Sequence, residues 1–153
     1  TSEDIQRLIA DMRETMVEYE GIGLAAPQVH ESIQLAIIGY EADGEPKVVI
    51  NPKVTVVDSD EQGYWEGCLS VPELRGFVYR PRAIRVDFLD EHGEAKSVSA
   101  DGFLATVFQH ELDHLAGILY VDRIKDPTKF AFYEEYERYH TPSESSDIGE
   151  LAD

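Results

Sequence analysis

The sequence has a single cysteine among its 153 residues, few basic side chains and no long apolar run. One cysteine excludes an internal disulfide, and it fits either a reducing compartment or a thiol kept for chemistry. No apolar stretch approaches the roughly 18 residues that a membrane-spanning helix needs. No secretory signal precedes the first helix-like segment. We therefore expect a cytoplasmic protein, with an organelle left open because the sequence starts at Thr1 and its N-terminus could be trimmed.

Basic residues are also scarce, with 13 Lys and Arg against 31 Asp and Glu, for a net charge of −18. This balance argues against direct contact with nucleic acid, because neutralising phosphates requires Lys and Arg. The negative charge favours solubility or adaptation to a salty milieu, with attraction of a cationic substrate as the alternative. We expect a single domain over residues 1–140, followed by an acidic, disordered tail over residues 141–153.

Hydrophobic periodicity predicts a helix, then several strands, then further helices. Ser2 can cap a first helix that runs to about Tyr19, with apolar residues at helical spacing. The predicted strands, separated by turn signals, are Gln34–Ile38, Lys47–Ile50, Val54–Val57, Phe77–Tyr79, Ala83–Leu89 and Lys96–Ser99. Helices are predicted over residues 101–116 and 127–139. This order predicts an α+β fold, with mainly antiparallel sheets packed around the helix of residues 101–116.

The most informative pattern is His-Glu-Leu-Asp-His at residues 110–114. On a helix, His110 and His114 leave the same face one turn apart, so two imidazoles can bind one metal ion. Glu111 projects about 100° round the helix, close enough to contact a water on the metal rather than the metal itself. The pattern therefore predicts a metal-dependent hydrolytic site. Two histidines that are merely hydrogen-bonded in a core helix are the alternative.

A catalytic metal site usually has three protein ligands and an open position. Cys68, within Glu-Gly-Cys-Leu-Ser at residues 66–70, is the candidate third ligand, and Gly67 permits a tight backbone turn beside it. A small buried hydrophobe is the alternative role for this cysteine. Residues 21–28 form a further segment of small residues. Pro27 stiffens it, so that Gln28 can offer its amide N–H to a carbonyl oxygen; an ordinary connector is the alternative.

Three segments together, GIGLAAPQ (21–28), EGCLS (66–70) and QHELDH (109–114), resemble the signature motifs of peptide deformylases. The resemblance implies an α+β enzyme that removes the N-formyl group from the initiator methionine of nascent polypeptides. It implies one divalent metal ion on Cys68, His110 and His114, with Fe²⁺ as the native ion and Zn²⁺, Ni²⁺ or Co²⁺ as possible occupants. It also implies Glu111 as the general acid and base. Gln28 and the backbone N–H of Leu69 would bind the formyl oxygen.

The same resemblance predicts the substrate-binding residues. Backbone around Ile22, Gly23 and residues 69–73 would hold the peptide as a strand. A methionine pocket would be lined by Ile22, Tyr64, Phe103, Thr106 and Val107, although each of these residues could simply belong to the core. We group Glu66 and Arg75 with the substrate-binding residues. We also expect either Arg75 or Arg80 to support the site by pairing with Glu66 or Asp113; solvated surface charges are the alternative.

The sequence departs from the family pattern at both ends. The extended segment that usually precedes the first helix is missing, so we expect either a trimmed chain or a shortened member. Bacterial members can dock on the ribosome through a basic C-terminal helix, but here the region from Glu134 is acidic. Ribosome docking by that route is therefore not expected. The expected partners are N-formylmethionyl peptides and nascent chains, acted on by a monomer.

Three other functions compete with this interpretation. A zinc endopeptidase shares the two-histidine helix, but its third ligand typically follows that helix, where only His140 is available. A thiol enzyme would use Gln28, Cys68 and a histidine, but two histidines one turn apart suit a metal better. A non-catalytic metal-binding domain would need neither Glu111 nor Gln28. Replacing Glu111 by Gln distinguishes these functions.

Overall fold

The computed structural model describes residues 2–39 and 44–140, and these ranges form one curved antiparallel sheet with three α-helices. In chain order the elements are α1 (Glu3–Glu18), β1 (Gly23–Ala25), η1 (Ala26–Val29), β2 (Leu35–Ile38), β3 (Lys47–Cys68), β4 (Val71–Leu89), β5 (Ala95–Asp101), α2 (Gly102–Leu115), η2 (Tyr120–Arg123), η3 (Pro127–Lys129), β6 (Phe130–Phe132) and α3 (Tyr133–Tyr139). The strand order is β1-β2-β3-β4-β5, with β6 added to β4. The predicted α+β class is confirmed. The acidic tail predicted for residues 141–153 lies outside the described residues.

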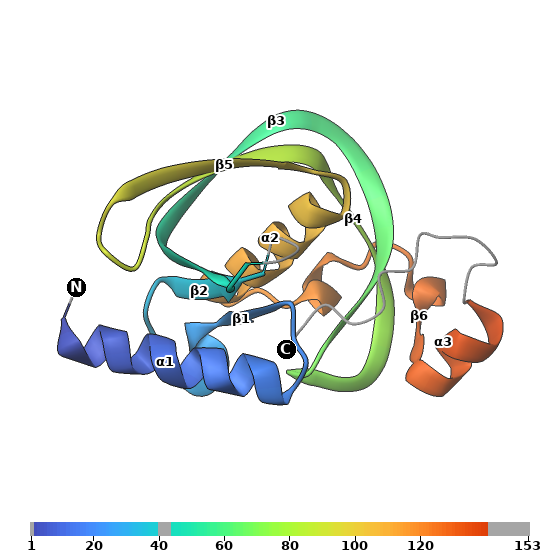
Figure 1. Cartoon of the computed structure of the whole chain (residues 1–153). Coiled ribbons are helices and arrows are strands. Elements are labelled where there is room, and N and C mark those ends of the chain that lie inside the picture. Colours follow the sequence, from blue (N-terminus) through green and yellow to red (C-terminus); the bar gives the residue numbers. More distant parts are fainter. Residues whose placement is uncertain (1, 40–43, 141–153) are drawn as a thin grey trace.

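Figure 1 shows the long strands β3 and β4, together with the shorter β5, arching over α2, while β1, β2 and α1 lie on its other side. Helix α2 is therefore the centre of the molecule, as the sequence predicted. It begins at Gly102, whose φ of +57° suits glycine, and Gly117 follows it at a φ of +74°. None of the helices within the described ranges is long and apolar enough to span a bilayer.

The prediction of several short strands was wrong for the middle of the chain. The predicted strands over 47–50 and 54–57 belong to β3, and those over 77–79 and 83–89 belong to β4. Strands β3 and β4 form one long hairpin, and the turn signals Asn51-Pro52 and Pro81 lie inside these strands. The register of the hairpin shifts between Ile50 and Lys53 and again further along. Asn51 takes a left-handed φ of +50° at the first shift. Bulges of this kind accept residues that would otherwise end a strand.

Helix α1 follows its sequence pattern closely. Ser2 caps it by accepting a hydrogen bond from the backbone N–H of Ile5, and its buried residues are Ile9, Met12 and Met16. These side chains pack with Leu35 and Ile37 of β2, whereas the alternate β2 residues Ala36 and Ile38 join a second core on the α2 side. Because successive strand residues point to opposite faces, β2 separates two cores.

The helix predicted for residues 127–139 is only partly present. Pro127–Lys129 form a short 3-10 turn capped by Asp126, Phe130–Phe132 form β6, and α3 begins at Tyr133. Strand β6 pairs with Leu74–Gly76 of β4, and these tertiary backbone hydrogen bonds override the local helical preference. Beyond β6, Tyr136 of α3 packs against Trp65, with ring centroids 5.1 Å apart.

Candidate metal centre

Helix α2 brings the two motif histidines together. His110 and His114 leave the same face one turn apart, and both are buried. Their ring centroids lie 5.2 Å apart, and the ring planes are nearly perpendicular at 84°. Phe108 and Leu112, on the opposite face, pack into the apolar core. The core therefore anchors the helix and fixes the direction in which both imidazoles point.

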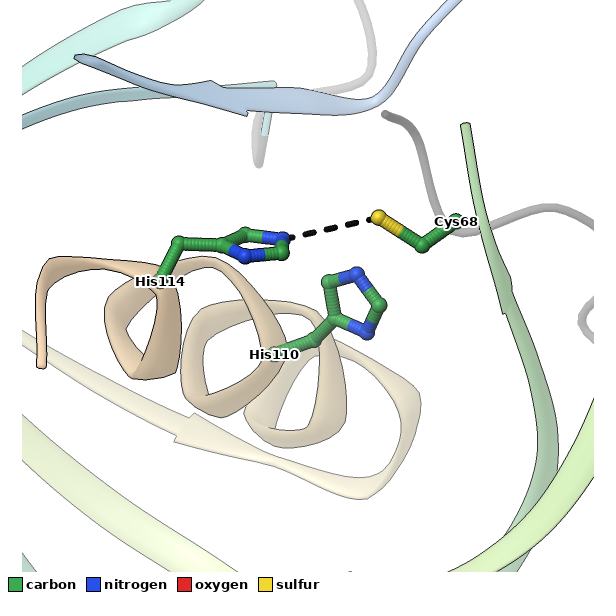
Figure 2. A group of neighbouring side chains, drawn as sticks. All are labelled: Cys68, His110 and His114. Carbon is green, nitrogen blue, oxygen red and sulfur yellow. Dashed lines mark hydrogen bonds between the residues drawn. The ribbon is translucent and has the colours of Figure 1, made fainter. Parts of the chain in front are cut away.

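Cys68 ends β3 and faces both histidines, as Figure 2 shows. Its Sγ is 3.6 Å from Nε2 of His114, and candidate ligand atoms of Cys68, His110 and His114 all lie within 4.8 Å of one another. Atoms that are each about 2.0–2.3 Å from a common ion lie roughly 3–4 Å apart. The three buried side chains are thus spaced to hold a single metal ion after small rotations.

Glu66 lies behind His110 and determines how its imidazole is protonated. Its Oε1 is 2.9 Å from Nδ1 of His110, and Arg80 donates hydrogen bonds to both carboxylate oxygens at 2.8 and 3.0 Å. Burial opposes ionisation of Glu66, but the hydrogen bonds from His110 and Arg80 hold its pKa below the usual value. Because an ionised carboxylate only accepts hydrogen bonds, Nδ1 carries a proton, and in the tautomer that this selects Nε2 has the lone pair.

That Nε2 atom of His110 is buried and has no hydrogen-bond partner within the described part of the chain. The pKa of His114 is lowered to about 4, first by burial and then by the neighbouring His110, so this imidazole is neutral near neutral pH. Neutral imidazole nitrogens and a cysteine sulfur are the donors that transition metals prefer. The residues present therefore fit a divalent metal ion.

A chain of ion pairs continues from Glu66 to the surface. Arg80 also donates to Asp113 at 2.9 Å, and Asp113 accepts a further hydrogen bond from Arg123 at 2.8 Å. Burial raises the pKa of Asp113, but the hydrogen bonds from Arg123 and Arg80 lower it overall. The prediction that one arginine pairs with Glu66 or Asp113 is confirmed, since Arg80 pairs with both. Arg123 was not predicted, because nothing in its sequence spacing signals this contact.

Glu111 is fully buried and packs against β1. A Cβ atom added at Gly23 would lie 2.7 Å from its Cγ and 2.8 Å from its Cδ. Such approaches are too close for any side chain, so only glycine allows β1 to pass here. Gly23, predicted as a substrate-binding residue, is therefore also required to seat the carboxylate of Glu111.

Gln28 reaches the same cluster from η1. Its Oε1 accepts a hydrogen bond from the backbone N–H of Ala25 at 2.9 Å, which leaves Nε2 pointing the other way. That Nε2 lies 3.7 Å from Sγ of Cys68 and donates to the Ser70 hydroxyl at 3.1 Å. A hydrogen-bond donor is therefore directed at the candidate metal centre. Ser70 is a contact that the sequence interpretation missed, although it lies within the EGCLS segment.

The predicted methionine pocket is only partly assembled by direct contacts in the structure. Tyr64 and Phe103 lie together, with ring centroids 6.2 Å apart, and Phe103 is 36% exposed. Thr106 and Val107 are buried on α2, and Gln62 donates weakly to the Thr106 hydroxyl at 3.5 Å. Ile22 packs at the edge of the core that surrounds α2. Their role in binding methionine stays a prediction.

Two predicted substrate-binding residues, Glu66 and Arg75, make contacts that support the candidate ligands. Glu66 is fully buried and hydrogen-bonded to His110. Arg75 is 4% exposed, and its guanidinium lies 4.5 Å from the centroid of the Tyr133 ring. A Cβ at Gly67 would come within 2.6 Å of that guanidinium. These contacts support His110 and the Cys68 segment, and a role of both residues in substrate binding stays a prediction. Leu69, in contrast, is 45% exposed beside Cys68.

A buried cysteine and two buried imidazoles, with a buried glutamate on the same helix, are the residue set of a metal-dependent hydrolase. The fold places this set on the central helix, surrounded by an antiparallel sheet. Comparison with known proteins identifies the particular family.

The family model described as polypeptide deformylase matches residues 1–130. A peptide deformylase of Leptospira biflexa is 41% identical over 143 residues, which cover 88% of this chain and 80% of that protein. The crystal structure of a peptide deformylase from Synechococcus elongatus in complex with actinonin superposes with a TM-score of 0.78 at 38% identity, covering 93% of this chain and 76% of that one. The peptide deformylase of Thermotoga maritima gives a TM-score of 0.77 at 40% identity, covering 82% of this chain and 84% of that one.

The chain belongs to the polypeptide deformylase family. It is an enzyme of a metal-dependent family whose known function is the deformylation of nascent polypeptides. The resemblance seen in the three sequence motifs is confirmed.

Proposed function

We propose that this chain removes the formyl group from N-formylmethionyl peptides with Cys68, His110 and His114 holding one divalent metal ion. The observation that carries this proposal is the buried cluster of three candidate ligand atoms within 4.8 Å of one another. Glu66 supports it, because its carboxylate selects the His110 tautomer whose Nε2 can bind a metal. When bound, a divalent ion there supplies Lewis acidity, which lowers the pKa of water and polarises a carbonyl group.

Glu111 is the proposed general base and acid. It takes the proton of the attacking water and later returns a proton to the departing amine, so formate and a free N-terminus are released. Its burial and its contact with Gly23 hold the carboxylate on the metal-binding helix, beside both histidines. A positioned acid or base of this kind typically contributes about 10²–10⁴ in rate.

Gln28 and Leu69 are the proposed donors to the formyl oxygen. The carboxamide of Gln28 is oriented by Ala25, so that Nε2 faces Cys68. Leu69 follows Cys68 in the turn between β3 and β4, where its backbone N–H could donate from the other side. Donors that are fixed before the reaction stabilise the negative charge that develops on the formyl oxygen in the transition state.

The methionine side chain would enter a pocket lined by Ile22, Tyr64, Phe103, Thr106 and Val107. The contact between Tyr64 and Phe103 supports this proposal, because the two rings join β3 to the first turn of α2. His110 follows Thr106 by one turn of the same helix, so a side chain in this pocket would lie next to the candidate metal centre.

We take Fe²⁺ as the native ion because of the family resemblance, with Zn²⁺, Ni²⁺ or Co²⁺ as possible substitutes. Ligand chemistry alone does not select iron, because zinc binds such donors more tightly than Fe²⁺. The native metal therefore depends on availability in the cell. We further propose a monomeric, cytoplasmic enzyme whose catalytic domain spans residues 1–140 and whose substrates are nascent chains. The acidic residues of α3 disfavour ribosome docking through this helix.

The test is formate release from a formyl-Met peptide by protein purified without oxygen, with metal content measured on the same sample. Turnover with about one metal ion per chain, lost on chelation, is the expected result. Bound metal without formate release would contradict the proposed catalytic roles. Protein without metal would refute the Cys68, His110 and His114 site and favour thiol chemistry instead. Cleavage of an unformylated peptide would indicate an endopeptidase.

A further inference from the structure

Tyr120 lies against the face of His110, and no sequence motif pointed to it. The two rings are nearly parallel, with an interplanar angle of 18° and centroids 6.1 Å apart, which is an offset stack. The side chain is only 1% exposed. Tyr120 begins η2, five residues after the end of α2, so the chain turns back at Gly117 and places this ring beside the helix that it has just left.

The surroundings of Tyr120 hold its ring in place. It packs in a small apolar cluster with Cys68 and Val78 and also stacks on His110. It therefore lies beside two of the candidate metal ligands. Gly76 of β4 leaves room for Ile124, because a Cβ there would lie 2.4 Å from its Cδ1, and that Cβ would also lie 3.2 Å from the ring edge of Tyr120. Ile124, the residue that follows η2, forms a β-bridge with Val78 and fixes η2 against β4. The ring therefore has little space in which to tilt.

The hydroxyl of Tyr120 does not explain why this residue is buried. Within the described residues it has no hydrogen-bond partner, and a buried polar group without a partner is unfavourable. What the side chain contributes is its flat ring. The hydrogen bond from Nδ1 to Glu66 fixes one atom of His110, but the imidazole can still swing about that bond. A second flat surface alongside removes this freedom.

We propose that Tyr120 is a positioning residue of the metal centre, whose ring holds the plane of His110 so that Nε2 faces Cys68 and His114. The inference rests on the proposed metal site formed by Cys68, His110 and His114. In this arrangement Glu66 determines the tautomer of His110, and Tyr120 determines its orientation. A correctly oriented ligand holds the metal longer, because less rearrangement is needed to keep the bond.

The experiment uses the full chain, freed of metal and loaded with Co²⁺ as the probe. The absorption band of cobalt bound to thiolate reports occupancy, and its decay in excess EDTA gives the rate of metal release. Tyr120→Phe keeps the ring, whereas Tyr120→Leu removes it. Phe108→Leu is the control, because Phe108 is equally buried on the opposite face of α2. Tyr120→Met, which fills similar volume without a flat ring, replaces Tyr120→Leu if that variant does not fold.

We expect Tyr120→Leu to release cobalt at least about 10-fold faster than the unaltered chain, as for other residues that orient metal ligands. Tyr120→Phe should stay within about twofold, and Phe108→Leu should lower the melting temperature without accelerating release. Equal acceleration in Tyr120→Leu and Phe108→Leu would reduce Tyr120 to core packing and overturn the proposal. Acceleration in Tyr120→Phe would assign the effect to the hydroxyl and also overturn it. Failure of the unaltered chain to bind cobalt would refute the metal site itself.

Discussion

Helices α1 and α2 have similar lengths, 16 and 14 residues, but they bury different chemistry. The buried residues of α1 are all apolar: Ile9, Met12 and Met16. Helix α2 buries Thr106, His110, Glu111 and His114 together with its apolar residues. Burying polar groups is unfavourable unless partners satisfy them, so α2 carries a cost that α1 avoids.

The partners of α2 show where that cost is offset. Glu66 of β3 pairs with Nδ1 of His110, and Arg80 of β4 pairs with Glu66 and continues to Asp113. Among the described residues, the buried face of α1 is an apolar stripe, and the ion pair that α1 makes through Arg13 with Glu91 is only partly buried. This difference indicates that the buried polar residues of α2 serve the chemistry of the site, whereas the apolar stripe of α1 serves the stability of the fold. Four substitutions and one change of pH test this difference between α1 and α2.

The largest effect is expected from removing a proposed ligand. Cys68→Ala leaves two imidazoles and no thiolate, so metal content measured by elemental analysis should fall to near zero and formate release should stop. Val17→Ala, at a residue of α1 that is 74% exposed, is the control and should change neither quantity. Retention of one tightly bound metal ion in Cys68→Ala would remove this cysteine from the ligand set.

Glu111→Gln should abolish chemistry without removing the metal. An amide cannot take the proton, so kcat should fall by about 10²–10⁴ while metal stoichiometry stays the same. The same substitution at Glu14, an exposed residue of α1, is the matched control and should leave kcat unaltered. A Glu111→Gln variant with normal kcat would exclude this residue as the base.

Met12→Ala should produce the opposite pattern. Met12 is fully buried in the cluster between α1 and β2, so losing its side chain should lower the free energy of unfolding by about 2–5 kcal/mol. Urea unfolding gives this value, and the metal content of the folded protein should stay the same. Loss of metal from folded Met12→Ala would show that the two helices are not independent.

The metal-free protein should lose stability as the pH falls from about 6.5 to about 4. The folded-state pKa of His114 lies near 4, below its ordinary value of 6.5, so the unfolded chain binds this proton first. Stability therefore rises with pH in this window, by about 3 kcal/mol at most. Urea unfolding at several pH values measures the slope. His114→Asn should show a smaller slope, and an unchanged slope would contradict the assignment to His114.

Glu66→Gln is expected to have the smallest effect on the site, because the shape of the side chain is kept. The neutral amide is a weaker partner for Nδ1 of His110, so metal affinity measured by chelator competition should fall about 10–100-fold. Glu61→Gln is the control, since Glu61 pairs with Lys125 at 2.9 Å on the surface. A pair of that kind contributes about 1 kcal/mol or less to stability and should not affect metal affinity. Equal metal affinity in both variants would exclude Glu66 from support of the metal centre.

Much of the fold was predictable where local pattern and burial agree. The apolar stripe and Ser2 cap of α1 and the two histidines of α2 follow directly from helical spacing. The strands were predicted less well, because β3 and β4 pass through Pro52 and Pro81 by shifting register. A bulge depends on the partner strand, so single-strand patterns do not reveal it. The strand β6 was missed for the same reason, since it exists only by pairing with β4.

The sequence by itself determined the α+β class and the helix that carries the two histidines with the glutamate between them. It also determined the family to which the chain belongs. These features depend on residues that are close in the chain, where periodicity and motif spacing act directly. Tertiary structure alone decided that Glu66 lies behind His110, that Arg80 joins Glu66 to Asp113, and that Tyr120 stacks on His110. These contacts join residues 10 to 44 positions apart. Only the folding of β3, β4 and η2 around α2 brings them together, because long-range packing has no signature in local sequence.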